Sequence, residues 1–175
     1  MSTEQSLIAT LLAKDEIREL VLLYSRGVDR KDIALLRSLY TSDATDHHAT
    51  AFSGTADEYI QFLERSLPHI HVSGHYVCNH LISVDGDQGE GEVYALAYHI
   101  IPDSKGGMVE DLCCVRYVDR YRRENSRWRF AARDVSFDMR SVRPVAKPER
   151  AAPSWTDDPS VTRLGSRLFA RGPRA

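Results

Sequence analysis

Four stretches of sequence decide the fold of this chain: HVSGHYVCNHLISV (71–84), EVYALAYHII (92–101), MVEDLCCVRYVDRYR (108–122) and RWRFAARDVSFDMR (127–140). Each is rich in apolar, β-branched and aromatic residues that alternate with polar ones, which is typical of strands with one buried face. Short links rich in Gly, Asp, Asn and Ser separate them. Such links favour hairpins. The sequence therefore predicts a four-stranded antiparallel meander.

Three helices are expected before the meander. Asp32 can cap a short second helix that runs through Leu39, because its carboxylate can accept from the free N–H groups of the first turn. A third helix is expected over residues 56–67, ended by Pro68, after a short extended piece around 45–52. The first helix is a long amphipathic one ending near Gly27, with this apolar stripe at three- and four-residue spacing: Ile8, Leu11, Leu12, Ile17, Leu20, Val21, Tyr24 and Val28.

Helices followed by an antiparallel meander form an α+β pattern. In this pattern a curved sheet wraps around a helix face and leaves a pocket at its open end. We assign this domain to residues 1–140. Residues 141–175 form an extension with five of the seven prolines and an apolar set, Val161, Leu164, Leu168 and Phe169, that suggests a final helix. The extension is expected to dock on the barrel or on a neighbouring subunit, with the subunit contact favoured.

Composition narrows the class of partner. The chain carries 23 Lys plus Arg against 25 Asp plus Glu, a balance that argues against nucleic acid as a partner. No window approaches the roughly 20 apolar residues that cross a bilayer, and the N-terminus does not resemble a secretion signal. We therefore expect a cytoplasmic protein with a small-molecule substrate. The three cysteines, Cys78, Cys113 and Cys114, suggest small buried residues rather than a disulfide framework.

Histidine is the unusual feature, since the chain holds seven. A cluster of imidazoles suggests a metal ion. However, strand periodicity places His71 and His75 on one face and His80 on the other, so no three of them converge locally. The chain also lacks G-x-G-x-x-G, a Walker sequence and H-E-x-x-H. We therefore expect neither a metal ion nor another cofactor.

The other use of histidine is proton transfer at neutral pH. Such a histidine needs an orienting carboxylate, and Asp29, at the end of the first helix's apolar stripe, is a candidate to orient His75. The alternative is that Asp29 only caps the turn in VDRKD (28–32). His99 shares a strand face with Ala95 and Ala97. These small residues would leave room for a ligand, although a solvated histidine at a strand end fits equally well.

Four further side chains are candidates for substrate contacts. Tyr24, His48 and Tyr117 offer hydroxyl or imidazole groups, although aromatic residues at helix and strand spacing more often belong to the core. Arg133 interrupts a strand face of small residues. It can pair with a buried carboxylate or with an anionic substrate, and an internal ion pair is the favoured interpretation.

These landmarks, YSRGVDRKD (24–32), HVSGHYVCNH (71–80), YALAYH (94–99) and WRFAARDVSF (128–137), resemble the SnoaL-like branch of the nuclear transport factor 2-like superfamily, which includes scytalone dehydratase and hexachlorocyclohexane dehydrochlorinase. The resemblance implies a cone-shaped curved antiparallel sheet around N-terminal helices. It also implies that Asp29 and His75 are the catalytic dyad and that His99 is a second active-site histidine. Trimers with C-terminal segments that cross between subunits are implied as well.

The chain departs from the dehydratase pattern at four positions. Where the dehydratase has two tyrosines, this chain has Val28 and His48. Where the dehydratase has a serine and an asparagine, this chain has Val115 and Tyr117. The resemblance therefore implies a cofactor-independent lyase with a differently lined pocket, acting on a small, largely apolar cyclic substrate by elimination of water or halide. An isomerase, a polyketide cyclase with the same dyad, or a non-catalytic binding or assembly module are the alternatives.

Overall fold

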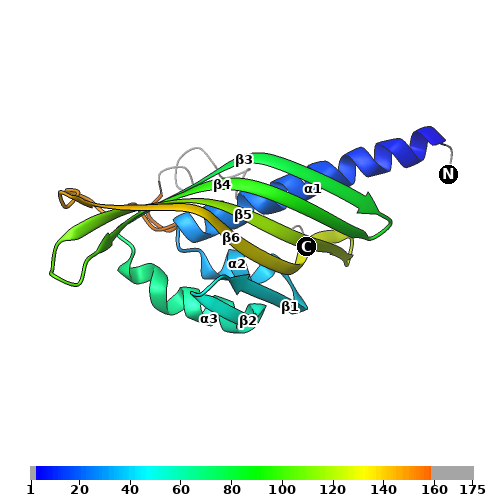
Figure 1. Cartoon of the computed structure of the whole chain (residues 1–175). Helices are drawn as coiled ribbons and strands as arrows, with labels where there is room; N and C mark the ends of the chain where they lie inside the picture. Colours follow the sequence, from blue (N-terminus) through cyan, green and yellow to red (C-terminus); the bar gives the residue numbers. More distant parts are fainter. Residues whose placement is uncertain (1–2, 159–175) are drawn as a thin grey trace.

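The computed structural model describes residues 3–158, in which a curved sheet lies against three helices (Figure 1). The helices are α1 (Thr3–Asp29), α2 (Ile33–Ser38) and α3 (Ala56–Ser66), followed by the 3-10 turn η1 (Leu67–His69). The strands are β1 (Tyr40–His48), β2 (Phe52–Thr55), β3 (Val72–Asp85), β4 (Gln88–Pro102), β5 (Met108–Glu124) and β6 (Arg127–Val145). This order confirms the predicted α+β class.

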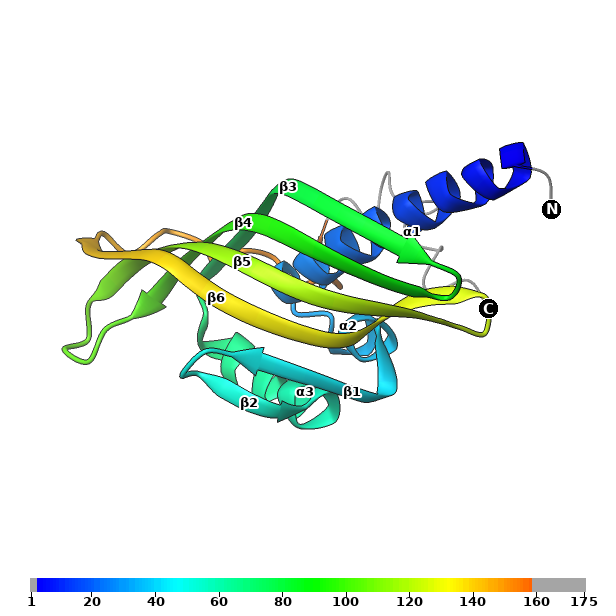
Figure 2. The same ribbon diagram turned by 45° about the vertical axis from the view of Figure 1, so that its right-hand side comes forward.

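The six strands are arranged in the order β2-β1-β6-β5-β4-β3. Strands β3 to β6 form the predicted meander, while β1 runs parallel to β6. The sheet curves around the helices and does not close (Figure 2). Residues 45–52, expected to form one short extended piece, belong to a hairpin of β1 and β2. Strand β1 begins earlier, at Tyr40, where it pairs with β6. The chain turns at Ala49, whose φ is 45°.

The core lies between α1 and the concave face of the sheet. Ile17 and Val21 of α1 are fully buried, as are Val93 of β4 and Phe130 of β6. Asp32 caps α2 as predicted, since its side chain accepts from the backbone N–H of Leu35 at 3.0 Å. This cap places the end of α1 and the start of α2 side by side, next to β3.

Gly27 does not end α1, which continues to Asp29. A Cβ added at Gly27 would lie 2.8 Å from two side-chain carbons of Leu36 on α2, closer than carbon atoms pack. Gly27 therefore allows the two helices to approach one another. This approach holds the end of α1, and Asp29 with it, against the sheet.

Two apolar surfaces remain exposed. The first turns of α1 extend past the end of the sheet (Figures 1 and 2), so Ile8, Leu11 and Leu12 of the predicted apolar stripe remain 51–66% exposed. On the outer sheet face, Tyr76, Leu96, Cys114 and Met139 form one row across four strands. The expected homo-oligomer, which stays a prediction, would cover such surfaces.

Three smaller observations complete the fold. Cys113 is buried as expected, whereas Cys78 is exposed. Strand β6 runs to Val145 and so includes the first residues of the C-terminal extension. None of the helices in residues 3–158 is long and apolar enough to span a membrane.

Candidate active site

Asp29 is the last residue of α1, where the helix dipole makes a carboxylate unfavourable. Three donors from β3 compensate for this position. The Asp29 carboxylate accepts from the Nδ1 of His75 at 2.7 Å, the backbone N–H of His75 at 2.9 Å and the hydroxyl of Ser73 at 2.8 Å. The alternative that Asp29 caps its own turn does not hold, because backbone carbonyls accept from the N–H groups after Asp29.

These bonds favour the ionised form of Asp29 and one tautomer of His75. Burial raises the pKa of Asp29, but the hydrogen bonds and charge of His75 and the bond from Ser73 together bring it below its usual value. A carboxylate is an acceptor only, so we assign the His75 proton to Nδ1. The lone pair of neutral His75 then lies on Nε2, which makes no hydrogen bond to any described residue. Nε2 is therefore free to take a proton from a ligand.

His99 lies beside this pair as expected. It stands opposite Ser73 in the β3–β4 register, and its ring centroid is 5.2 Å from that of His75. Burial lowers the pKa of His99 to about 4, with a further contribution from His75, although Asp111 and Asp29 oppose the shift. His99 is therefore neutral near pH 7, and it can donate or accept a hydrogen bond but is not a charged acid.

The lowered pKa of His99 predicts a pH dependence of stability. An unfolded histidine titrates near 6.5, so between about pH 6.5 and 4 the unfolded chain binds more protons at this residue than the folded chain does. Stability therefore falls as the pH is lowered through this window. His99→Gln should reduce the loss of unfolding free energy between pH 7 and pH 4 by on the order of 1–3 kcal/mol. Urea unfolding of both proteins at each pH measures this, and an unchanged loss would contradict it.

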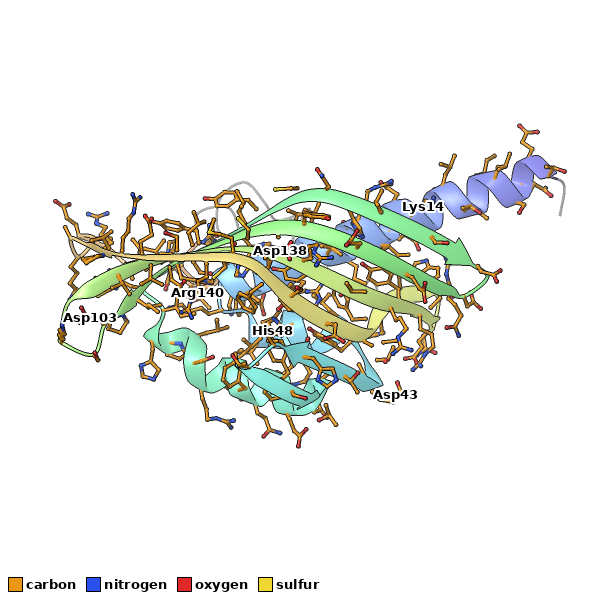
Figure 3. The ribbon with its side chains drawn as sticks, viewed as in Figure 1. Lys14, Asp43, His48, Asp103, Asp138 and Arg140 are labelled. Carbon is orange, nitrogen blue, oxygen red and sulfur yellow. The ribbon has the colours of Figure 1, made fainter. Side chains whose placement is uncertain are left out.

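Tyr24 and His48, two of the four predicted substrate contacts, belong to one hydrogen-bond network. The Tyr24 hydroxyl lies 2.8 Å from that of Tyr59 on α3, which in turn lies 3.1 Å from the Nε2 of His48. His48 (Figure 3) also stacks on Tyr59, and its Nδ1 lies 2.5 Å from the buried carboxylate of Asp46. The sequence analysis missed Asp46 and Tyr59, although the two-residue spacing of Asp46 and His48 signals a shared strand face.

Arg133, the third predicted contact, forms the favoured internal ion pair. Its partner is Asp119 on β5, bound through two hydrogen bonds of 2.8 Å, and both side chains are fully buried. The guanidinium carbon lies 4.1–4.3 Å from three ring centroids, those of Tyr24, Tyr117 and Phe130. Its Nη1 is buried and has no hydrogen-bond partner in the described part of the chain. Whether Arg133 also contacts a substrate stays a prediction.

Tyr117, the fourth predicted contact, lies between these groups. Its ring centroid is 6.2 Å from that of Tyr24, and its hydroxyl makes no hydrogen bond to a described residue. Burial raises the pKa of Tyr117, and the nearby charge of Asp29 adds to the shift. Tyr117 thus lies between Tyr24 and the Asp29–His75 pair.

His80 corrects the argument from strand faces. A bulge between Val77 and His80 shifts the β3–β4 register, so His80 lies inside, 3.2 Å from the hydroxyl of Tyr121. The period-two rule places it outside. Among residues 3–158, no three His, Cys, Asp or Glu side chains are grouped in a way that could hold a metal ion.

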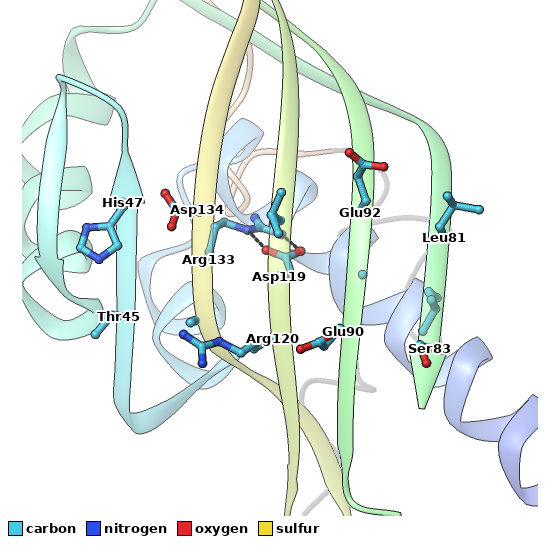
Figure 4. A pocket seen from close by; sticks show the side chains of 14 residues that line it. Thr45, His47, Leu81, Ser83, Glu90, Glu92, Asp119, Arg120, Arg133 and Asp134 are labelled. Atoms are coloured by element: carbon cyan, nitrogen blue, oxygen red, sulfur yellow. Dashed lines mark hydrogen bonds and ion pairs between the residues drawn. The ribbon is translucent and has the colours of Figure 1, made fainter. Parts of the chain in front are cut away.

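Two hollows are relevant to access. The larger, about 710 Å³, lies on the face of the sheet away from α1 and is lined by side chains such as Leu81, Glu92 and Val118 (Figure 4). A smaller one, about 320 Å³, contains both Asp29 and His75. We place the site at the smaller hollow, because the larger contains no comparable pair of oriented acid and base.

The C-terminal segment borders this smaller hollow. Its backbone binds the domain where Ala152 donates to the carbonyl of His71 and Trp155 donates to that of Arg30. Asp158 lines the hollow and pairs with Arg30 at 2.6 Å. Up to residue 158 these contacts are with the chain's own domain, whereas the predicted final helix lies outside the described residues.

Solved structures with this architecture include several enzymes. A provisionally assigned scytalone dehydratase from Novosphingobium aromaticivorans is 20% identical with a TM-score of 0.68, over 83% of this chain and 94% of that chain. A hexachlorocyclohexane dehydrochlorinase, LinA type 2, is 20% identical with a TM-score of 0.68, over 82% and 95%. LinA type 3 from Novosphingobium barchaimii is 19% identical with a TM-score of 0.66, over 82% and 97%. At such identities the likeness shows the fold alone.

The sequence itself also matches a family. No curated protein matches it, but a family model described as the SnoaL-like domain matches residues 9–134, which is most of the chain. A further solved structure with this fold, from Streptomyces avermitilis, is described as NTF2-like; it is 15% identical with a TM-score of 0.62, over 73% of this chain and 98% of that chain. The chain therefore belongs to the SnoaL-like domain family.

Proposed function

We propose that this protein is a cofactor-independent lyase that eliminates water or halide from a small cyclic carbonyl compound, with His75 as base and Asp29 as its orienting partner. One observation carries the proposal. His75 has Nδ1 held by a carboxylate that is itself bound by Ser73, its Nε2 has no hydrogen-bond partner among residues 3–158, and the residue lines a hollow. A histidine in a purely structural role would have no need of a free basic nitrogen beside a hollow.

The proposed step is a β-elimination. Nε2 of His75 takes the proton from the carbon next to the carbonyl, and the electron pair of that C–H bond forms the new C=C bond. The bond to the leaving group breaks, and its electrons depart with the halide, or with the hydroxyl oxygen, which takes up one proton from an acid or from solvent and leaves as water. Asp29 stabilises the imidazolium that forms. Neutral His99 is placed to donate a hydrogen bond to the oxygen on which negative charge develops.

Two features support elimination from an uncharged substrate. The small strand residues near the dyad, Ala95 and Ala97, are apolar and buried, and the neutral state of His99 avoids a second positive charge beside His75. Solved relatives with this fold include a named dehydrochlorinase and a provisionally assigned dehydratase. Isomerisation and cyclisation would begin with the same proton abstraction and differ in the product.

The test uses two cyclic ketones of nearly equal size, 3-hydroxycyclohexanone and 3-fluorocyclohexanone. Both give cyclohexenone, whose ultraviolet absorbance reports elimination. We expect enzyme-dependent formation of cyclohexenone from at least one of them, and in deuterated water we expect exchange at the carbon next to the carbonyl. A protein that produced neither signal with either ketone would contradict lyase activity on this class of substrate.

A further inference from the structure

A second carboxylate–imidazole pair lies inside the domain, apart from Asp29 and His75. The Asp46 side chain is fully buried and binds two groups, the Nδ1 of His48 at 2.5 Å and the hydroxyl of Tyr40 at 2.7 Å. The His48 side chain remains 16% exposed. The pair therefore combines a carboxylate in the dry interior with an imidazole that can exchange protons with water.

The other nitrogen of His48 begins a chain of hydroxyl groups. Its Nε2 lies 3.1 Å from the hydroxyl of Tyr59, which lies 2.8 Å from the hydroxyl of Tyr24. When both nitrogens of His48 carry protons, Nδ1 donates to Asp46 and Nε2 donates to Tyr59. Tyr59 then donates to Tyr24, so the hydroxyl proton of Tyr24 is left for a ligand. All donors in the chain then point in one direction.

His48 lies beside a core that holds several buried charges. Asp46 and Asp119 are both buried carboxylates, and Arg133 is the buried cation of the same core. Arg133 is already bound to Asp119 by two hydrogen bonds. Besides Asp46 and Tyr40 on β1, the polar groups packed around His48 are neutral hydroxyls from α1 and α3. Asp46 also stands opposite Arg133 in the β1–β6 register, but its side-chain hydrogen bonds are to His48 and Tyr40.

The chain ends on the side of the interior that faces the dyad. Tyr24 precedes Asp29 by five residues on α1, which is about 7.5 Å along the helix axis. Tyr117 lies between them, edge-on to the Tyr24 ring and within the electrostatic reach of Asp29. The relay proposed below requires a small ring bound at His75 to reach the Tyr24 hydroxyl with its far side, past Tyr117.

The chemistry leaves a role for such a chain. Hydroxide is a poor leaving group and needs a proton as the C–O bond breaks, whereas fluoride leaves as a stable anion. His75 acts as the base, and His99, whose pKa is about 4, is neutral and makes a poor proton donor. Protonated His75 can return its proton only to a hydroxyl on the same face of the ring, so a hydroxyl that leaves from the opposite face needs a second acid.

We propose that Asp46, His48, Tyr59 and Tyr24 form a proton relay that protonates the leaving hydroxyl group during water elimination; this rests on the proposed function. The proton on Nε2 of His48 moves to the Tyr59 oxygen, the Tyr59 proton moves to the Tyr24 oxygen, and the Tyr24 proton moves to the leaving oxygen. That oxygen departs as water with the electrons of the C–O bond. His48 regains a proton from solvent, and His75 releases one.

The test compares the two ketones in His48→Gln, which keeps hydrogen-bonding capacity but cannot supply a proton. Elimination of water from 3-hydroxycyclohexanone should fall by about 100-fold or more, while elimination of fluoride should change by less than about fivefold. The matched control is His47→Gln, whose Nδ1 binds Ser53 on the adjacent strand. This variant should eliminate both leaving groups at the original rate.

Tyr59→Phe removes a single hydroxyl group and tests the relay should His48→Gln fail to fold. It should show the same split between leaving groups. Equal losses for both ketones in these variants, or no loss for either, would overturn the relay. His75→Ala separates this result from the proposed function. If His75→Ala abolishes both eliminations while the relay variants spare both, the dyad stands and the relay is wrong; if His75→Ala spares both, the proposed function itself fails.

Discussion

Replacing His75 with alanine should reduce elimination of fluoride from 3-fluorocyclohexanone by about 10³–10⁴-fold. The variant removes the nitrogen that takes the proton but leaves the backbone N–H of residue 75, which also binds Asp29. The carboxylate keeps this N–H and the Ser73 hydroxyl as donors. We therefore expect a folded protein, so the lost rate can be assigned to chemistry.

Asp29→Asn should produce a loss of similar size by a different route. An amide has one acceptor oxygen, whereas three donors converge on the Asp29 carboxylate. The amide group can also donate to Nδ1, which would move the His75 proton to Nε2 and block its lone pair. In a serine protease triad, the equivalent replacement of aspartate by asparagine lowers the rate by about 10⁴-fold for this reason.

Two control variants make this prediction specific. Ser73→Ala removes one of the three donors and should lower the rate by about 10- to 100-fold, less than the loss in His75→Ala, since one hydrogen bond to a charged group contributes about 1.5–3 kcal/mol. His80→Gln changes another interior histidine of β3, bound to Tyr121 rather than to Asp29, and should leave the rate unchanged. Equal losses in His80→Gln and His75→Ala would show that the strand as a whole matters and not the free nitrogen.

Local patterns predicted much of the fold. The alternating stretches predict β3 to β6 because their turns are short and rich in Gly, Asp and Ser. Two features depend on tertiary contacts instead. Gly27 resembles a helix end in the sequence, but its role is set by Leu36 of a different helix. The apolar stripe at Ile8 and Leu11 stays exposed, because periodicity shows that a face is apolar but not how far the sheet extends beneath it.

The candidate site likewise contains residues that the sequence predicted and residues that only the structure shows. Residue type together with a family resemblance pairs Asp29 with His75, and the structure brings them into contact. Asp46 and Tyr59 were missed because their network joins β1, α1 and α3, whose packing no single stretch of sequence reveals. His80 was placed on the wrong face, since a bulge inserts a residue that the alternation rule does not anticipate.

Breaking the Arg133–Asp119 ion pair should cause the largest loss of stability among these predictions. Both side chains are fully buried, and Asp119 raises the pKa of Arg133 well above its usual value although burial opposes this. Asp119→Leu would leave the guanidinium in a dry interior without a counter-charge. We expect the free energy of unfolding to fall by about 3–5 kcal/mol. Urea denaturation monitored by circular dichroism measures this loss, and a loss below about 1 kcal/mol, the size of a typical surface pair, would contradict it.

The double variant Asp119→Leu with Arg133→Met tests what the arginine is for. Removing both charges leaves an apolar core, so most of the lost stability should return, because a buried ion pair is often replaceable by apolar residues at little cost. Nη1 of Arg133 has no hydrogen-bond partner among residues 3–158, and a buried donor left unpaired costs about 1–3 kcal/mol. If a substrate oxygen or halogen supplies the missing acceptor, the double variant should regain stability but show a KM raised by about tenfold. Recovery of both stability and KM would instead limit Arg133 to holding β5 and β6 against α1, and the substrate contacts would then be those of the dyad, His99 and the tyrosines.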